Sequence, residues 1–113
     1  MPHCIIEYAK EVEQSLAVNA LLLGVYQTVV GSQLFEEQSI KTRAIAYEHY
    51  LIGGDKKPFI HITLKILFGR NHQQKKDLTK SVLDTLTEVV QSPISLSVEV
   101  MDIDKVSYKK LVI

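Results

Sequence analysis

The 113-residue sequence has no tryptophan, a single cysteine and no surplus of either charge. One cysteine cannot form an internal disulfide, which fits a reducing compartment, and we expect a cytoplasmic protein. Lys plus Arg and Asp plus Glu both total 13, so the basic surplus typical of nucleic-acid-binding proteins is missing. No apolar run is long enough to span a bilayer, and the N-terminus lacks a signal-peptide pattern. We therefore expect neither a nucleic acid nor a membrane as partner.

Patterns typical of several kinds of site are also missing. None of the four histidines lies at metal-ligand spacing from another His or from Cys4, which gives no reason to expect a bound metal ion. There is no phosphate-binding glycine loop, no Ser-His-Asp pattern and no pair of catalytic carboxylates. Cys4 lies in an apolar segment, which favours packing over a nucleophilic role.

Hydrophobic residues make up 46% of the sequence, which is typical of a globular protein, and the length predicts one domain over residues 1–113. Apolar alternation predicts strands, and apolar positions three to four apart predict helices. The expected elements are a strand at 2–8, a helix at 11–30, a strand at 40–51, a turn at 53–55, a strand at 59–68, a helix from the N-cap Asn71 to Ser92-Pro93, a strand at 94–100, and a turn with an added edge strand at 109–113.

This order is β-α-β followed by β-α-β, which suggests a duplicated unit. Right-handed crossovers place both helices on one face of a single sheet. The expected fold class is thus α/β in the two-layer α+β sense, with a four-stranded sheet. His61, Thr63 and Lys65 alternate with the apolar positions of their strand and face the uncovered side. Such a face commonly packs against another subunit, so His61 is either a pocket-lining residue or a subunit contact.

Pro2 offers chemistry that an ordinary side chain does not. If Met1 is removed, Pro2 becomes a secondary amine at the N-terminus, and an α-amino group titrates near pH 7.7–8.0. Burial beside cations would lower that pKa further and make the amine a general base at neutral pH. The alternative is that Pro2 only begins an edge strand, where its missing N–H has no consequence.

The sequence has only two arginines, Arg43 and Arg70. Arginine holds a carboxylate with two parallel hydrogen bonds better than any other residue. Arg43 lies on the second expected strand, and Arg70 lies between the third strand and a helix N-terminus, a position that itself favours anions. The alternative is that both are surface residues with incidental ion pairs.

Three stretches together resemble the 5-carboxymethyl-2-hydroxymuconate Δ-isomerase family of the tautomerase superfamily, whose members use an amino-terminal proline. They are residues 2–8 (PHCIIEY), residues 40–43 (IKTR), and residues 61–66 (HITLKI) followed by Gly69-Arg70. The resemblance runs in order from Pro2 to about Val100. The sequence departs from the family in having no tryptophan and a different loop at residues 53–57.

The resemblance implies a β-α-β-β-α-β subunit, a homotrimer, and active sites near subunit boundaries. It implies that Pro2 is the catalytic base and that Arg43 and Arg70 bind a small dicarboxylate substrate. The implied reaction converts a conjugated 2-hydroxy dienoate to its 2-oxo isomer without a cofactor, in a pathway that degrades an aromatic compound. Two alternatives stay open: a diverged tautomerase with another 2-oxo acid substrate, and a non-catalytic trimer that binds a small acid.

Overall fold

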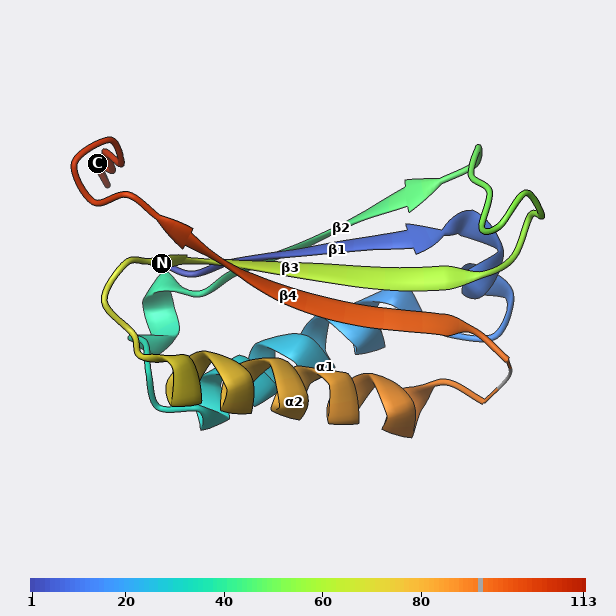
Figure 1. Ribbon diagram of the computed structural model, residues 1–113, viewed down its shortest axis with the longest axis horizontal. Coiled ribbons are helices and arrows are strands. Elements are labelled where there is room, and N and C mark those ends of the chain that lie inside the picture. Colours follow the sequence, from blue (N-terminus) through green and yellow to red (C-terminus); the bar gives the residue numbers. More distant parts are fainter. Residues whose placement is uncertain (92) are drawn as a thin grey trace.

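A computed structural model describes residues 1–91 and 93–113 of the chain, in which two helices cover one face of a four-stranded sheet (Figure 1). The strands are β1 (His3–Ala9), β2 (Lys41–Tyr47), β3 (Phe59–Leu67) and β4 (Ser95–Ile103). The helices are α1 (Val18–Gly31) and α2 (His72–Val89), with short 3-10 helices η1 (Lys10–Gln14) and η2 (Glu37–Ser39). The expected fold class is therefore confirmed.

The strand order is β2-β1-β3-β4. β1 pairs with β2 in parallel and β3 pairs with β4 in parallel, whereas the two central strands β1 and β3 run antiparallel. Each parallel pair is joined through one helix, as a parallel connection requires. The start of β1, the start of β2 and the end of β3 consequently lie at one end of the sheet.

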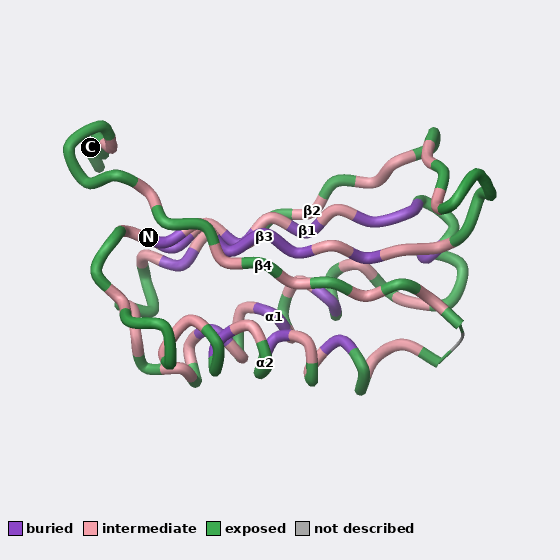
Figure 2. Tube along the Cα trace, viewed as in Figure 1, coloured by how far each residue is buried: buried purple, intermediate pink, exposed green. Residues whose placement is uncertain are grey.

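The core lies between the sheet and the helices, where Figure 2 shows buried residues along the central strands and the facing helix sides. The alternation predicted for β3 is confirmed, because Ile60, Ile62, Leu64 and Ile66 are fully buried. Ile60, Ile62 and Leu64 belong to one core cluster with Cys4 and Ile6 from β1, with Leu21, Val25 and Val29 from α1, and with Leu78, Val82 and Leu86 from α2. Burying these side chains supplies the main driving force for folding.

The opposite side of the sheet, here called the open face, has no helix over it (Figure 1). The strand registers place twelve central positions of the four strands on this face. Five of them carry charge and four more are polar, so a large part of the face is hydrophilic. The positions are His3, Ile5, Glu7, Lys41, Arg43, Ile45, His61, Thr63, Lys65, Ser97, Glu99 and Met101.

The single helix predicted over residues 11–30 is wrong. The chain instead forms η1, then a break at residues 15–17, then α1. Val12 packs into the core and Tyr8 donates a hydrogen bond to Glu13 at 2.6 Å, which fixes η1 close to the end of β1. Ala17 is extended (φ −74°, ψ 123°), and this residue turns the chain into the helix layer. Periodicity alone did not reveal that change of direction.

Other boundaries also differ from the predictions. β2 ends at Tyr47 rather than at 51, and the predicted turn follows, with Gly53 and Gly54 at positive φ between the paired residues Ile52 and Asp55. The Asn71 N-cap is confirmed as a full capping box with Gln74. α2 ends at Val89, and its predicted end at Ser92 lies outside the described residues.

The edge strand predicted at residues 109–113 is wrong. The expected turn is present after β4, where the Ser107 hydroxyl donates to the Asp104 carboxylate at 2.9 Å, but no strand follows it. The turn directs the C-terminal tail, residues 104–113, away from the sheet edge. The tail lies instead near the N-terminus, where Tyr108 contacts His3 (Figure 1).

Candidate active site

Pro2 lies at the end of the sheet where the start of β1, the start of β2 and the end of β3 lie together. Its ring is buried, and its carbonyl oxygen accepts a hydrogen bond from the Lys41 backbone N–H at 3.0 Å. This bond continues the parallel pairing of β1 and β2 by one residue. With Met1 attached, the Pro2 nitrogen is an amide without a basic lone pair.

The amino group of Met1 lies among positive charges. It donates to the Ser39 carbonyl oxygen at 3.2 Å. Burial lowers the pKa of this amino group, and the charges of Lys41, Lys110 and Arg70 lower the pKa further, against an opposing effect of Glu36. We call the Met1 amino group, Lys41, Arg70 and Lys110 the cationic end of the sheet. An environment of this kind favours a neutral amine and a bound anion.

Arg70 is held rigidly at the cationic end. Its Nη2 donates to the Leu34 carbonyl oxygen at 2.6 Å, and its guanidinium lies over the Phe35 ring, 4.8 Å from the centroid. Gly69 precedes it with φ 135°, a conformation that side-chain-bearing residues rarely adopt, and this turn directs the chain from β3 into α2. Arg70 makes only one described hydrogen bond, and a guanidinium has five N–H donors, so donors remain for a carboxylate.

Arg43 lies two residues along β2 from Lys41, on the open face. Its Nη1 is 3.0 Å from Nδ1 of His3, and Nε2 of His3 is 3.2 Å from the hydroxyl of Tyr108. Arg70 therefore lies close enough to the Met1 amino group for its charge to lower the pKa of that group. Arg43 lies beside His3, the residue that follows Pro2.

Sequence reasoning missed four residues of this region: His3, Lys41, Tyr108 and Lys110. Lys41 had a signal, because it shares a strand face with Arg43. Partial burial lowers the pKa of Lys41, and the nearby charges of Lys110 and Arg43 do so as well. Tyr108 and Lys110 had no signal, since the tail has no periodic pattern that predicts where it packs.

His61 lies elsewhere on the open face. On β3, His61 pairs with Glu7 and Lys65 pairs with His3. His61 and Lys65 are four residues apart, which is about 13 Å along the strand at the usual rise. Nδ1 of His61 is 2.7 Å from the Ser97 hydroxyl, and its Nε2 is 2.5 Å from the Glu99 carboxylate. The structure does not bring His61 to Pro2, and it leaves both alternatives, a pocket-lining residue and a subunit contact, open.

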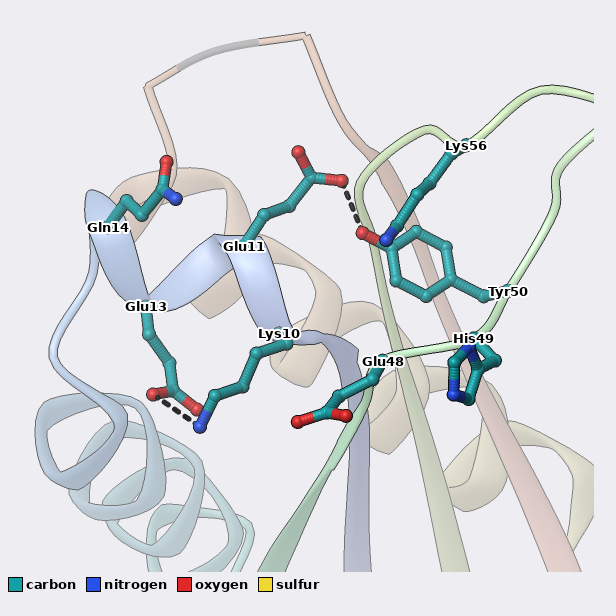
Figure 3. A pocket seen from close by; sticks show the side chains of 8 residues that line it. All are labelled: Lys10, Glu11, Glu13, Gln14, Glu48, His49, Tyr50 and Lys56. Carbon is teal, nitrogen blue, oxygen red and sulfur yellow. Dashed lines mark hydrogen bonds and ion pairs between the residues drawn. The ribbon is translucent and has the colours of Figure 1, made fainter.

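A hollow of about 790 Å³ lies at the end of the sheet opposite the cationic end (Figure 3). Its polar side chains are largely satisfied by each other. Tyr50 donates to Glu11 at 2.5 Å, Lys10 pairs with Glu13 at 3.2 Å, and Lys56 lies over the Tyr50 ring. Groups engaged in this way offer little to a ligand, so the cationic end is the better candidate despite the size of the hollow.

Two further kinds of chemistry would need a reactive thiol or a cluster of metal ligands. Burial raises the pKa of the Cys4 thiol to about 11, and this cysteine is fully buried, so the packing role expected for it is confirmed. Within residues 1–91 and 93–113, no three His, Cys, Asp or Glu side chains gather as metal ligands would.

Neither α1 nor α2, the two α-helices in the part of the chain that the structure describes, is both long and apolar enough to cross a membrane. The cytoplasmic location expected from the sequence stays a prediction.

Comparisons with solved structures show the same fold. A 5-carboxymethyl-2-hydroxymuconate delta-isomerase matches with a TM-score of 0.87 and 17% identity, covering 98% of this chain and 88% of that one. A 5-carboxymethyl-2-hydroxymuconate isomerase from Deinococcus radiodurans R1 matches with a TM-score of 0.84 and 24% identity, over 97% and 88%. A fused 4-OT wild type symmetric trimer matches with a TM-score of 0.74 and 15% identity, over 94% and 91%.

No curated protein matches the sequence. The model of the family described as 5-carboxymethyl-2-hydroxymuconate isomerase, in contrast, matches residues 2–113, which is nearly the whole chain. The chain therefore belongs to the 5-carboxymethyl-2-hydroxymuconate isomerase family and is an isomerase of the tautomerase type.

Proposed function

We propose that residues 1–113 form a single domain that isomerises a carboxylated 2-hydroxy dienoate of the 5-carboxymethyl-2-hydroxymuconate type without a cofactor. The observation that carries this proposal is that the amino group of Met1, the residue before Pro2, lies at the cationic end of the sheet. A dicarboxylate binds best where positive charges outnumber negative ones, and an amine acts as a base where its protonated form is disfavoured. The cationic end provides both conditions beside Pro2.

Pro2 is the base in this proposal once Met1 is removed. The neutral amine takes the proton of the substrate 2-hydroxyl, and the O–H electron pair remains on oxygen as a dienolate. The C=O bond then forms, the double bonds shift, and a carbon of the conjugated system takes the proton back from the Pro2 ammonium. The amine is regenerated, so the step needs no other reactant. Positive charge near the oxygen stabilises the dienolate.

Arg43 and Arg70 bind the substrate carboxylates. Arg70 is held by Leu34 and Phe35, and Arg43 by His3, so each guanidinium is oriented before substrate arrives. Orientation in advance reduces the entropy lost on binding. Lys41 and Lys110 add positive charge to the same region.

We further propose a homotrimer. No helix in the described part of the chain covers the open face, and a similar solved structure is described as a symmetric trimer. In a trimer, another copy would cover this face. Another subunit would then approach Arg43 and His61, which both lie on the open face.

The N-terminus provides the decisive experiment. Protein that retains Met1 and protein that begins at Pro2 are separated, identified by mass spectrometry, and assayed for ketonisation of the 2-hydroxy dienoate. We expect the Pro2 form to be active, with kcat/KM rising with pH because the base must be neutral. We expect the burial and cations that lower the pKa of the Met1 amino group to lower that of the Pro2 amine as well, so the rise should centre below about 7.7–8.0.

The form that retains Met1 should be folded and nearly inactive. Equal rates for the two forms would show that Pro2 is not the base. Activity in neither form, together with binding of a small carboxylate, would favour a non-catalytic binding protein. Activity of the Pro2 form toward other 2-oxo acids alone would favour a diverged tautomerase.

A further inference from the structure

Three side chains on one side of the proposed site form a continuous hydrogen-bonded chain. Arg43 Nη1 lies 3.0 Å from His3 Nδ1, and His3 Nε2 lies 3.2 Å from the Tyr108 hydroxyl. The His3 and Tyr108 rings meet edge to face, with their centroids 6.1 Å apart. β2, β1 and the C-terminal tail therefore meet at one imidazole.

The chemistry of arginine fixes the protons in this chain. A guanidinium is always protonated and has no acceptor, so Arg43 donates and His3 Nδ1 accepts. The imidazole is consequently neutral, carries its hydrogen on Nε2 and donates it to the Tyr108 oxygen. The hydroxyl hydrogen of Tyr108 then stays available for another acceptor.

The surroundings of His3 favour this neutral form. Burial is the largest cause that lowers the pKa of His3, and positive charges around the ring lower the pKa further. None of the described groups that shift this pKa is a carboxylate. The charged groups are Arg43 and Lys41 from β2, the Met1 amino group that precedes β1, and Lys65 from β3; Tyr108 faces the ring from the tail.

We propose that His3 is a positioning residue: its neutral imidazole, anchored by Tyr108, holds the Arg43 guanidinium in the orientation that receives a substrate carboxylate. This inference rests on the function proposed for Arg43. The bond to His3 uses one of five N–H donors, so the others remain for a two-point contact with a carboxylate.

Protonation of His3 would release Arg43. It would place a hydrogen on Nδ1, where the acceptor lone pair was, and a second positive charge beside the guanidinium. Substrate binding should therefore weaken as the pH falls through the pKa of His3, which lies below its usual value of about 6.5. The loss should appear in KM more than in kcat, because His3 does not touch the reacting atoms.

The test uses protein that begins at Pro2, and muconate, a conjugated dicarboxylate, as a binding probe that needs no turnover. Calorimetry gives the muconate Kd at pH 7.5 and 5.5 for wild type, His3→Ala, His3→Asn, Arg43→Ala and the double variant His3→Ala/Arg43→Ala. His49→Ala, in the distant hollow, is the matched control. Isomerase KM and kcat are measured in parallel.

We expect His3→Ala to weaken muconate binding roughly tenfold, the usual effect of losing a hydrogen bond to a charged group. The double variant should bind no more weakly than Arg43→Ala alone, because His3 acts only through Arg43. His3→Asn keeps an acceptor oxygen that does not titrate, so it should bind better than His3→Ala. Between pH 7.5 and pH 5.5, muconate binding should also weaken less in His3→Asn than in wild type, because the part caused by protonation of His3 is absent.

Nitrogen NMR of the His3 ring supplies a readout that is independent of activity and of the alanine variant's stability. The Nε2–H tautomer is expected, and an Nδ1–H tautomer would overturn the inference. Additive effects of His3→Ala and Arg43→Ala on the Kd would overturn it too, as would an unchanged Kd in His3→Ala. Wild type that binds muconate without isomerising the dienoate rejects the proposed reaction alone. Wild type that does not bind muconate rejects both.

Discussion

The two arginines carry the same charge but are held by different neighbours. Arg70 is tied to the backbone by the Leu34 carbonyl and stacks on an aromatic ring, so its position depends on the α1–β2 connection. Arg43 is tied to a titratable ring on the neighbouring strand, so we expect its position to depend on pH. A lysine ammonium lacks the planar fork of donors that lets a guanidinium keep its present partner and hold a carboxylate at two points.

Replacing either arginine by alanine should therefore reduce kcat/KM strongly. Removing one partner of a desolvated charge pair costs about 2–5 kcal/mol, which is roughly 30- to several-thousand-fold in kcat/KM. Arg43→Lys and Arg70→Lys should restore only part of the loss. Lys80→Ala, which removes an exposed cation paired with Asp84 on α2, is the control and should be near wild type. Near-wild-type kinetics of both alanine variants would contradict the proposed carboxylate site.

At the scale of elements, Asn71, the N-cap of α2, directly follows Arg70, so the first turn of α2 helps to fix the arginine. The Asn71 side chain accepts from the Gln74 backbone N–H at 2.8 Å, and the Gln74 side chain accepts from the Asn71 N–H at 2.9 Å. These two bonds satisfy donors that the start of a helix leaves unpaired. The cap therefore defines where the β3–α2 turn ends.

Asn71→Ala should lower the free energy of unfolding by about 1 kcal/mol, and Tm should fall by several degrees. Asn19→Ala, near the start of α1, is the matched control because no described hydrogen bond involves the Asn19 side chain. Thermal unfolding followed by circular dichroism at one fixed protein concentration measures both. A smaller loss in Asn71→Ala than in Asn19→Ala would show that the capping box contributes nothing.

At the scale of the whole molecule, the two faces of the sheet differ. The helix-covered face holds the core, whereas the open face carries charged and polar groups with Ile5, Ile45 and Met101 among them. A sheet with one uncovered, partly apolar face is well suited to bind further copies of itself. This asymmetry supports self-association of the kind that the proposed homotrimer requires.

Sedimentation equilibrium at micromolar concentration should give three times the chain mass. Ile45→Asp places a charge on the open face and should shift the protein toward monomers. Leu23→Asp is the matched control, because Leu23 on α1 and Ile45 on β2 are each 54% exposed, and it should stay trimeric. A stable wild-type monomer would rule out the trimer, and equal dissociation of the two variants would argue against the open face as the interface.

Local patterns predicted much of the fold. The alternation of β3, the Asn71 cap and the turn at Gly53-Gly54 depend on residues close together in the sequence, and all three are confirmed. The helix at 11–30 and the edge strand at 109–113 were wrong because both depend on where the chain must turn to meet other elements. For the candidate site, the sequence predicted Pro2, Arg43 and Arg70, which stay predictions, whereas the contacts that hold each arginine were not predictable from it.

The sequence by itself determined the type and order of the main elements, and its resemblance to a family was confirmed over residues 2–113. Those properties arise from spacing and residue type, which are local. Only the tertiary structure decided that Lys41, Arg70 and Lys110 surround the N-terminal amino group, and that Tyr108 reaches His3. The physical reason is the strand order: with β1 between β2 and β3, segments that are 38 to 105 residues apart meet at one end of the sheet.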